Sequence, residues 1–213
     1  MKTQKLLTNF VIIIVFLAIG FGCKLGNISN FDGGISESTD PKEAISIAFK
    51  KFQGVSFYHS VTTTKTAQAV VQTETDFNAP DKFWIKNSVA GTKSEVIVIG
   101  NESFSRLSEG KWSKMPENQM SATEMRKTMS EEAVTVMKDF EFVGKENLNG
   151  KDAFVYKFKS TYGGESASKI WIVADSGLPM RVDTEGNFGG TNMQMSTTYD
   201  FDQETKIEAP KVS

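Results

Sequence analysis

Hydrophobic and polar residues alternate along most of the chain between residues 55 and 201, a pattern typical of β-strands with one buried face. Phe83 and Ile85, for example, share one parity, while Trp84 lies between them on the other. Turn signals separate the alternating segments, and Asn149-Gly150 is the strongest hairpin signal among them. We therefore predict a sheet of about ten or eleven short antiparallel strands.

Two of these segments are hydrophobic on both parities, namely Val96–Ile99 and Ile170–Val173. A strand of this kind needs cover on both faces, or cover on one face and an apolar ligand on the other. The pattern itself leaves both alternatives open. The two segments lie in different halves of the predicted sheet, so the choice between cover and ligand applies to both halves.

An α-helical period is present near the start of this region. Asp40 is a good N-cap, Pro41 suits the first helical position, and Gly54 supplies an end. Hydrophobic residues recur every three or four positions between these signals: Ile45, Ala48, Phe49 and Phe52. The spacing predicts a helix with one strongly apolar face.

A second helix is predicted to start at Ser121 or Thr123 and to run to Phe140. Its hydrophobic positions again recur every three or four residues: Met125, Met129, Ala133, Val136, Met137 and Phe140. Unbranched thioether side chains adapt to irregular apolar partners, so a methionine-rich wall suits a lipid pocket. Ordinary core packing is the alternative for each methionine.

The N-terminus has the layout of an export signal. Lys2 and Lys5 precede a charge-free hydrophobic run over 10–21, and Gly22 stands directly before Cys23, the only cysteine. The run is shorter than the roughly 20 residues of a comfortable membrane span. This arrangement resembles the lipobox of bacterial lipoproteins, which implies cleavage before Cys23 and its acylation, for example with palmitate. An uncleaved signal anchor is the alternative.

The charge balance argues against nucleic acid as a partner. The full chain has a net charge of −2, and removal of Lys2 and Lys5 with the signal makes it −4. A mildly acidic chain without a basic cluster does not suit nucleic acid or anionic lipid headgroups. Membrane attachment is therefore expected through the N-terminus alone, and the polar residues 24–39 form a flexible tether.

The residues of common catalytic and metal sites are few. His59 is the only histidine, so neither a site with two histidine ligands nor a Ser-His triad can form. Ser108 to Lys111 matches S-x-x-K by letter but lies in a predicted turn, and no phosphate-binding glycine motif occurs. We expect no enzyme activity, no cofactor and no metal.

Several short stretches resemble the lipoprotein-carrier superfamily, which comprises LolA/LolB-like proteins, LppX/LprG-like lipoproteins and RseB-like sensor domains. The resembling stretches, in order, are Pro80-Asp81-Lys82-Phe83, Glu95 to Gly100, Gly110-Lys111-Trp112, Lys169 to Ile172, Gly177 to Met180 and Ile207 to Pro210. They cover about residues 40–210. The resemblance implies an α+β fold, in which a strongly curved antiparallel half-barrel of about 11 strands has two helices covering its concave face.

Three regions follow from the pattern and the resemblance together. Residues 1–22 form the signal peptide, 23–39 the lipidated Cys23 with its tether, and 40–213 the half-barrel domain. The candidate lining of a hydrophobic cavity consists of Phe49, Phe52, Trp84, Val96, Val98, Met125, Met129, Met137 and Trp171. Core packing is the alternative for the tryptophans.

The predicted function is a lipid-anchored protein of the bacterial cell envelope that binds or carries a lipid or the acyl chains of lipoproteins. One alternative is an envelope-stress sensor or adaptor that binds a protein partner, and another is a structural lipoprotein with a closed core. The domain is expected to face the periplasm. Lys24 follows the cysteine where an aspartate would signal inner-membrane retention in enteric lipoproteins, which favours the outer membrane.

Overall fold

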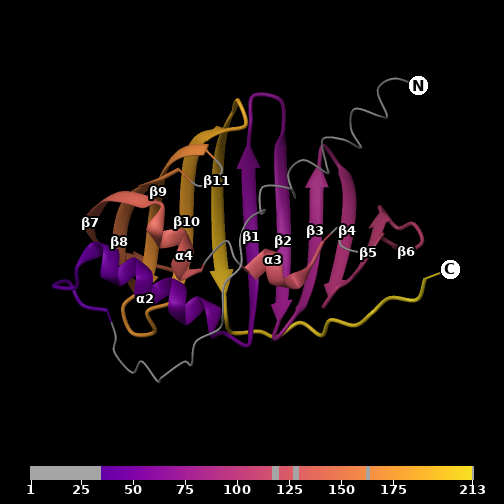
Figure 1. Cartoon of the computed structure of the whole chain (residues 1–213), viewed down its shortest axis with the longest axis horizontal. Coiled ribbons are helices and arrows are strands. Elements are labelled where there is room, and N and C mark those ends of the chain that lie inside the picture. The colour runs from indigo at the N-terminus through magenta and orange to yellow at the C-terminus, as the bar shows by residue number, and fades with distance from the viewer. Residues whose placement is uncertain (1–34, 117–119, 127–129, 162–163, 213) are drawn as a thin grey trace. The chain divides into compact units, whose positions relative to one another are not determined.

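The strands form one open antiparallel sheet (Figure 1). The structure is a computed structural model, and it describes residues 35–116, 120–126, 130–161 and 164–212. Within these ranges there are eleven strands: β1 (Phe57–Lys65), β2 (Val70–Asn78), β3 (Lys82–Val89), β4 (Thr92–Ile99), β5 (Glu102–Leu107), β6 (Ser113–Lys114), β7 (Met137–Leu148), β8 (Lys151–Ser160), β9 (Gly164–Val173), β10 (Pro179–Phe188) and β11 (Thr191–Asp200). Their order in the sheet is β6-β5-β4-β3-β2-β1-β11-β10-β9-β8-β7. The prediction of an α+β half-barrel is confirmed.

The first and last strands join the two halves of the sheet. β1 pairs with β2 on one side and with β11 on the other, in continuous register from His59 opposite Asp200 to Lys65 opposite Gln194. Every other neighbouring pair is adjacent in sequence, so the rest of the sheet is a series of hairpins. The β1–β11 pairing brings residues from both ends of the domain into the middle of the sheet.

The predicted hairpin at Asn149-Gly150 is confirmed. β7 ends at Leu148 and β8 begins at Lys151, so the loop has two residues. Their φ angles are 53° for Asn149 and 81° for Gly150. Both central residues of a type I′ turn need positive φ, which asparagine and glycine tolerate best.

Helix α2 (Pro41–Gln53) starts and stops where the sequence predicts. The side chain of Asp40 accepts hydrogen bonds from the backbone N–H groups of Lys42 and Glu43, and Gly54 is the C-cap. The helix buries one face: Ala44, Ile45, Ala48, Phe49 and Phe52. Ile35, which the sequence places in the tether, packs in the same core.

The second predicted helix differs from the prediction. The described residues form two helices of five residues each, α3 (Ala122–Arg126) and α4 (Glu131–Thr135), and residues 127–129 lie outside the description. The expected end at Phe140 is wrong because β7 begins at Met137. Met137 and Lys138 already pair with Ser160 and Lys159 of β8. Strand pairing with β8 thus prevails over the local helical pattern, since tertiary context overrides helix propensity.

The helices lie against one face of the sheet, which we call the helix face (Figure 1). Here β2, β3 and β4 contribute Phe77, Phe83 and Val98, which pack with Ala122 of α3. Side chains from β8 and β9 pack with those of α2 and α4: Phe154, Tyr156, Phe158, Ile170 and Ile172. No helix in the described ranges has the length and apolar character needed to cross a bilayer.

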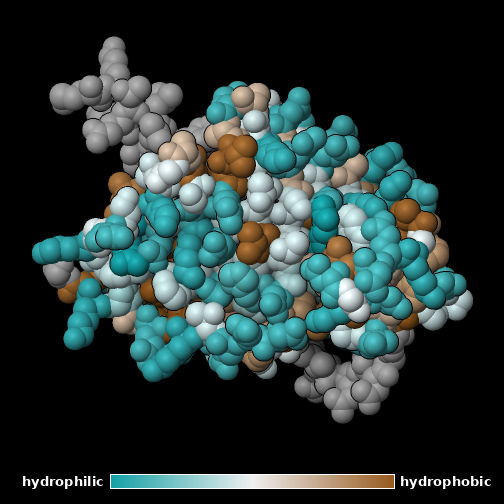
Figure 2. Space-filling view, turned by 180° about the vertical axis from the view of Figure 1, so that it is seen from behind, coloured by the Kyte–Doolittle hydropathy of each residue, from teal (hydrophilic) through white to brown (hydrophobic). Residues whose placement is uncertain are grey.

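We call the opposite face of the sheet the outer face. The alternate residues of the two doubly hydrophobic strands, Ile97 and Trp171, lie on it and are covered by other side chains. Ile97 packs with Phe104 and with Ile207 of the C-terminal segment. The Ile207 side chain is only 2% exposed. Trp171 packs with Ala153 and Val155. Protein side chains therefore supply cover on both faces of β4 and β9. Figure 2 shows the outer face as largely hydrophilic, with hydrophobic residues in small separate areas.

Candidate ligand-binding site

A cavity of about 170 Å³ lies between the helices and the middle of the sheet. It is lined by the C-terminal end of α2, by α3 and by the helix face of β1, β2, β3 and β11. The lining residues are Phe52, Gln53, Tyr58, Ser60, Thr62, Thr75, Phe77, Phe83, Met125, Arg126, Thr197 and Tyr199. The cavity thus combines an aromatic wall with a band of hydroxyl groups.

The aromatic wall is a continuous row of rings. The Tyr58 ring lies 5.0 Å from Phe52 and 5.2 Å from Phe77, and Phe77 lies 4.9 Å from Phe83, all between ring centroids. Tyr199 meets Phe52 edge to face at 5.2 Å. Such spacings are typical of favourable aromatic pairs, which add about 0.5–1.5 kcal/mol beyond the burial of their area. The wall is therefore rigid and apolar.

The two tyrosine hydroxyls of the cavity are neutral. Burial raises the pKa of both Tyr58 and Tyr199, and the positive charge of Arg126 opposes this increase only in part for Tyr58. A neutral phenol donates one hydrogen bond. Thr62 and Thr197 add hydroxyls that share a hydrogen bond of 2.9 Å across the β1–β11 pair. The cavity thus offers hydroxyl donors above an apolar wall.

Arg126 and Gln53 hold α3 to α2, an arrangement we call the helix clasp. Gln53 Nε2 donates to the carbonyl oxygen of Arg126 at 2.7 Å, and Arg126 Nη2 donates to the carbonyl oxygen of Gln53. Arg126 also donates to Pro80 at 3.4 Å, and its guanidinium lies 4.9 Å from the centre of the Phe77 ring. Desolvation lowers the pKa of Arg126, partly offset by Tyr58. The clasp closes the cavity at the helix side.

The neighbouring core under α2 and α4 contains one unusual polar group. Tyr156 is fully buried, and its hydroxyl has no hydrogen-bond partner among the described residues. Burial raises the pKa of Tyr156 to about 12. The surrounding cluster is filled by hydrophobic side chains, including Phe49, with Met137 packed against it. The structure thus places two of the predicted cavity residues in a closed core.

The remaining predicted residues divide between the two faces. Phe52 and Met125 line the cavity, while Val98 lies next to it in the cluster beneath α3 and Val96 packs against that cluster. Met129 and Cys23 lie outside the described residues.

Trp84 and Trp171 are on the outer face and do not line the cavity. Their parity is opposite to that of the helix-face residues, and each indole N–H donates to a carboxylate. The distances are 2.9 Å from Trp84 to Glu95 and 2.7 Å from Trp171 to Glu146. Charged partners of this kind are available because the outer face is polar.

Sequence reasoning missed the polar residues of the cavity. Tyr58 shares the parity of Ser60 and Thr62 in β1, so alternation could have grouped all three. Gln53 and Arg126 each follow a predicted lining residue directly, Phe52 and Met125. Polar residues at the edge of an apolar stripe are usually solvated, so nothing in the pattern distinguishes these two.

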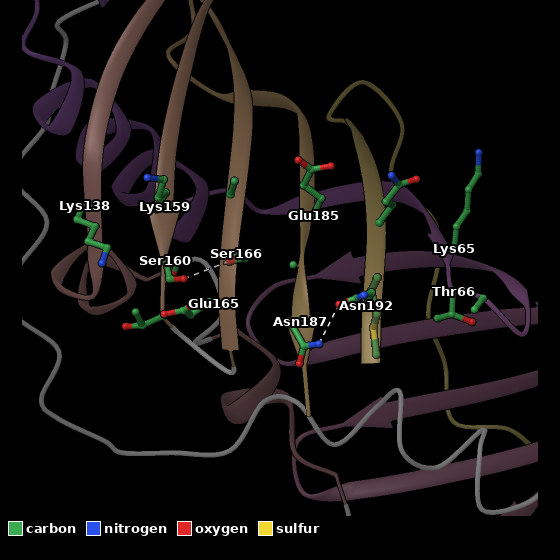
Figure 3. Close-up of a pocket in the computed structure, with 16 residues that line it drawn as sticks. Lys65, Thr66, Lys138, Lys159, Ser160, Glu165, Ser166, Glu185, Asn187 and Asn192 are labelled. Carbon is green, nitrogen blue, oxygen red and sulfur yellow. Dashed lines mark hydrogen bonds between the residues drawn. The ribbon is translucent and has the colours of Figure 1, made fainter. Parts of the chain in front are cut away.

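Three larger grooves among the described residues carry charged side chains. The first, of about 880 Å³, has Lys151, Asp175 and Asp202 in its lining. The other two are adjacent to each other. One of about 820 Å³ runs along the ends of β8 to β11 (Figure 3), and the close-up shows the Asn187–Asn192 hydrogen bond of 2.8 Å. Another of about 760 Å³ adjoins it along β7 to β1. Their linings include Lys65, Lys159 and Glu185. Charged side chains of both signs do not suit an acyl chain, so the small cavity is the better candidate site.

The fold defined by this sheet and its helices is also found in two mycobacterial proteins of known structure. The mycobacterial lipoprotein LppX from Mycobacterium tuberculosis superposes with a TM-score of 0.57 at 14% identity, covering 80% of this chain and 100% of LppX. LprF from Mycobacterium bovis gives a TM-score of 0.61 at 12% identity, covering 84% of this chain and 99% of LprF. No family model matches the sequence, and no curated protein matches it. The chain therefore has the LppX/LprF fold.

Proposed function

We propose that the protein is a non-enzymatic lipid-binding module of the bacterial cell envelope, tethered to a membrane through acylated Cys23. The observation that carries the proposal is the aromatic-lined cavity between α2, α3 and the sheet. Apolar burial contributes about 25 cal/mol per Å², so such a wall favours acyl chains. The likeness in fold to the lipoprotein LppX, and to LprF, supports the proposal.

The proposed ligand binding requires a change in the position of the helices, because the cavity is small. Its volume is about 170 Å³, whereas ligand pockets usually measure about 300–1,000 Å³. The helix clasp consists of two reciprocal hydrogen bonds between Gln53 and Arg126 rather than a large packed interface. Separation of α3 from α2 enlarges the cavity at a small cost in hydrogen bonds, each about 0.5–1.5 kcal/mol. We therefore place ligand entry at the clasp.

A matched pair of substitutions tests the site. Thr197 lines the cavity, and its neighbour Thr198 is exposed on the outer face of the same strand. Thr197→Trp fills the cavity and is expected to weaken the binding of a fluorescent fatty acid about tenfold or more. Thr198→Trp is expected to leave binding unchanged. Equal binding by both variants, with native folding by circular dichroism, contradicts the proposed site.

Lipid carried by the native protein gives an independent test. The protein is extracted from its own membrane in a mild detergent and analysed by native mass spectrometry. We expect a bound acyl lipid in addition to the acyl group on Cys23, and Thr197→Trp is expected to lose the bound lipid only. A wild-type protein that never carries a second lipid and takes up none when titrated counts against the function.

A further inference from the structure

Arg126 is the one charged residue among the described residues that line the cavity. It reaches the cavity from the last residue of α3, and Tyr58 and Tyr199 line the same space from β1 and β11. A positive charge does not stabilise a bound acyl chain, and partial burial of the charge in an apolar cavity costs desolvation free energy. The charge therefore points to the chemistry of the ligand's head.

The groups that contact the Arg126 guanidinium among the described residues are neutral. Two carbonyl oxygens, of Gln53 and Pro80, accept its hydrogen bonds, and the Phe77 ring lies below the guanidinium. No described carboxylate forms an ion pair with it. A partly desolvated cation without a counter-charge attracts an anion more strongly than an exposed one does. Among the described residues, the positive charge of Arg126 at the cavity thus has no carboxylate counter-charge.

The other polar groups of the cavity match an anion that only accepts hydrogen bonds. Tyr58 is held in its neutral form and can donate from its hydroxyl. The Thr62 and Thr197 hydroxyls share one hydrogen bond of 2.9 Å, which uses one of their two hydrogens. The hydroxyl that accepts in this bond can donate its own hydrogen to an anion. An ionised carboxylate accepts at both oxygens and donates nothing, which suits hydroxyl and guanidinium donors.

The volume limits the head group to a small one. A water molecule occupies about 30 Å³ of liquid, so about 170 Å³ holds roughly six groups of that size. A carboxylate with its first few methylenes fits this space. A glycerophosphodiester or a sugar does not, and the rest of a long chain requires the space that opens between α2 and α3.

We infer that Arg126 binds the carboxylate of a long-chain fatty acid, with its head between Arg126, Tyr58 and the Thr62–Thr197 pair. This inference rests on the proposed lipid-binding function and names its ligand class. The chain extends along the aromatic row that includes Phe52. Neutral lipids of the same chain length lack the charge that Arg126 complements.

Three ligands with the same chain test the assignment: oleate, methyl oleate and oleoyl lysophosphatidate. Delipidated full-length protein is titrated with each by competition against a fluorescent fatty acid. We expect oleate to bind about tenfold or more tightly than methyl oleate, since a charge-assisted bidentate bond is lost in the ester. Arg126→Gln is expected to bring this ratio close to one, and Arg126→Lys to keep part of it.

A second variant separates recognition from folding. Tyr58→Phe keeps the ring of the aromatic wall and is expected to weaken oleate several-fold without affecting methyl oleate. A wild-type protein that binds both equally, or a preference for oleate that survives Arg126→Gln, overturns the inference while leaving lipid binding intact. Arg126-dependent binding of lysophosphatidate without binding of oleate overturns the carboxylate assignment. Binding of none of the three contradicts the proposed function itself.

Discussion

Gln53 and Arg126 exchange hydrogen bonds through each other's backbone carbonyl oxygens, although 73 positions separate them in the sequence. One residue ends α2 and the other ends α3, so this pair joins the two helices beside the cavity. In the proposed function, these two side chains separate when a ligand enters.

Removal of the Gln53 amide is expected to speed ligand exchange. Gln53→Ala deletes the 2.7 Å bond to Arg126 but leaves the reverse bond to the Gln53 backbone. A hydrogen bond of about 0.5–1.5 kcal/mol corresponds to an increase of roughly two- to tenfold in the dissociation rate of a bound fatty acid. Stopped-flow displacement measures this rate. Gln72→Ala, at an exposed position of β2, is the control, and equal rates for the two variants contradict a role for the clasp.

The buried hydroxyl of Tyr156 is expected to destabilise the domain. Tyr156→Phe keeps the ring and deletes an oxygen that has no partner among the described residues. An unsatisfied buried polar group costs about 1–3 kcal/mol, so the free energy of unfolding is expected to rise by about 1 kcal/mol in urea denaturation. Tyr58→Phe supplies the comparison at a cavity tyrosine. A clear loss of stability in Tyr156→Phe would show that the hydroxyl has a partner.

Asp76 is expected to link stability to acidic pH. Burial acts to raise its pKa, but hydrogen bonds from His59 at 2.9 Å and Thr205 at 2.8 Å, with the charge of Lys86, lower it overall from 3.8. A carboxyl with a lowered native pKa stabilises the fold above its unfolded pKa. This contribution is lost as the pH falls from about 4 through the native pKa.

Substitution of Asp76 tests this linkage. Asp76 is only 3% exposed and holds Thr205 of the C-terminal segment, so Asp76→Asn is expected to cost about 1–3 kcal/mol at pH 7. The difference from wild type is expected to shrink as the pH falls below 4, measured by urea denaturation at several pH values. Asp175→Asn, in the loop between β9 and β10, is the control. A difference independent of pH down to 2 contradicts the linkage.

Membrane attachment is expected to depend on Cys23. Cys23→Ala is predicted to abolish incorporation of labelled palmitate and to leave the unprocessed precursor, because the thiol is the acylation site implied by the lipobox resemblance. Metabolic labelling followed by gel electrophoresis measures both effects. Cys23→Ser serves as a closer steric match. Labelling that persists in both variants contradicts the lipoprotein prediction.

Alternation and turn chemistry predicted most of the fold. The parity of Phe83 and Ile85 placed them together on one face, and Asn149-Gly150 formed the expected two-residue turn. Asp40 and Gly54 marked both ends of α2 because capping depends on neighbouring residues only. Local chemistry of this kind can be read without knowledge of the rest of the chain.

The candidate site was predicted only in part. Of the residues predicted to line a ligand cavity, Phe52 and Met125 lie in the lining of the small cavity, whereas Trp84 and Trp171 lie on the outer face. A strand hydrophobic on both parities does not indicate which of its faces the helices cover. Arg126 was not expected in the site at all, because a charged residue beside the apolar stripe of a helix is usually solvated.

The sequence alone determined the local features, namely the antiparallel hairpins of the sheet and the bounds of α2. The export signal before Cys23 stays a prediction. Tertiary structure decided that residues 137–140 join β8 as a strand, that Ile207 covers the outer face of β4, and that Arg126 enters the cavity. The physical reason is the range of the contacts. Periodicity and capping depend on residues within a few positions, whereas strand partners and cavity linings depend on residues far apart in the chain.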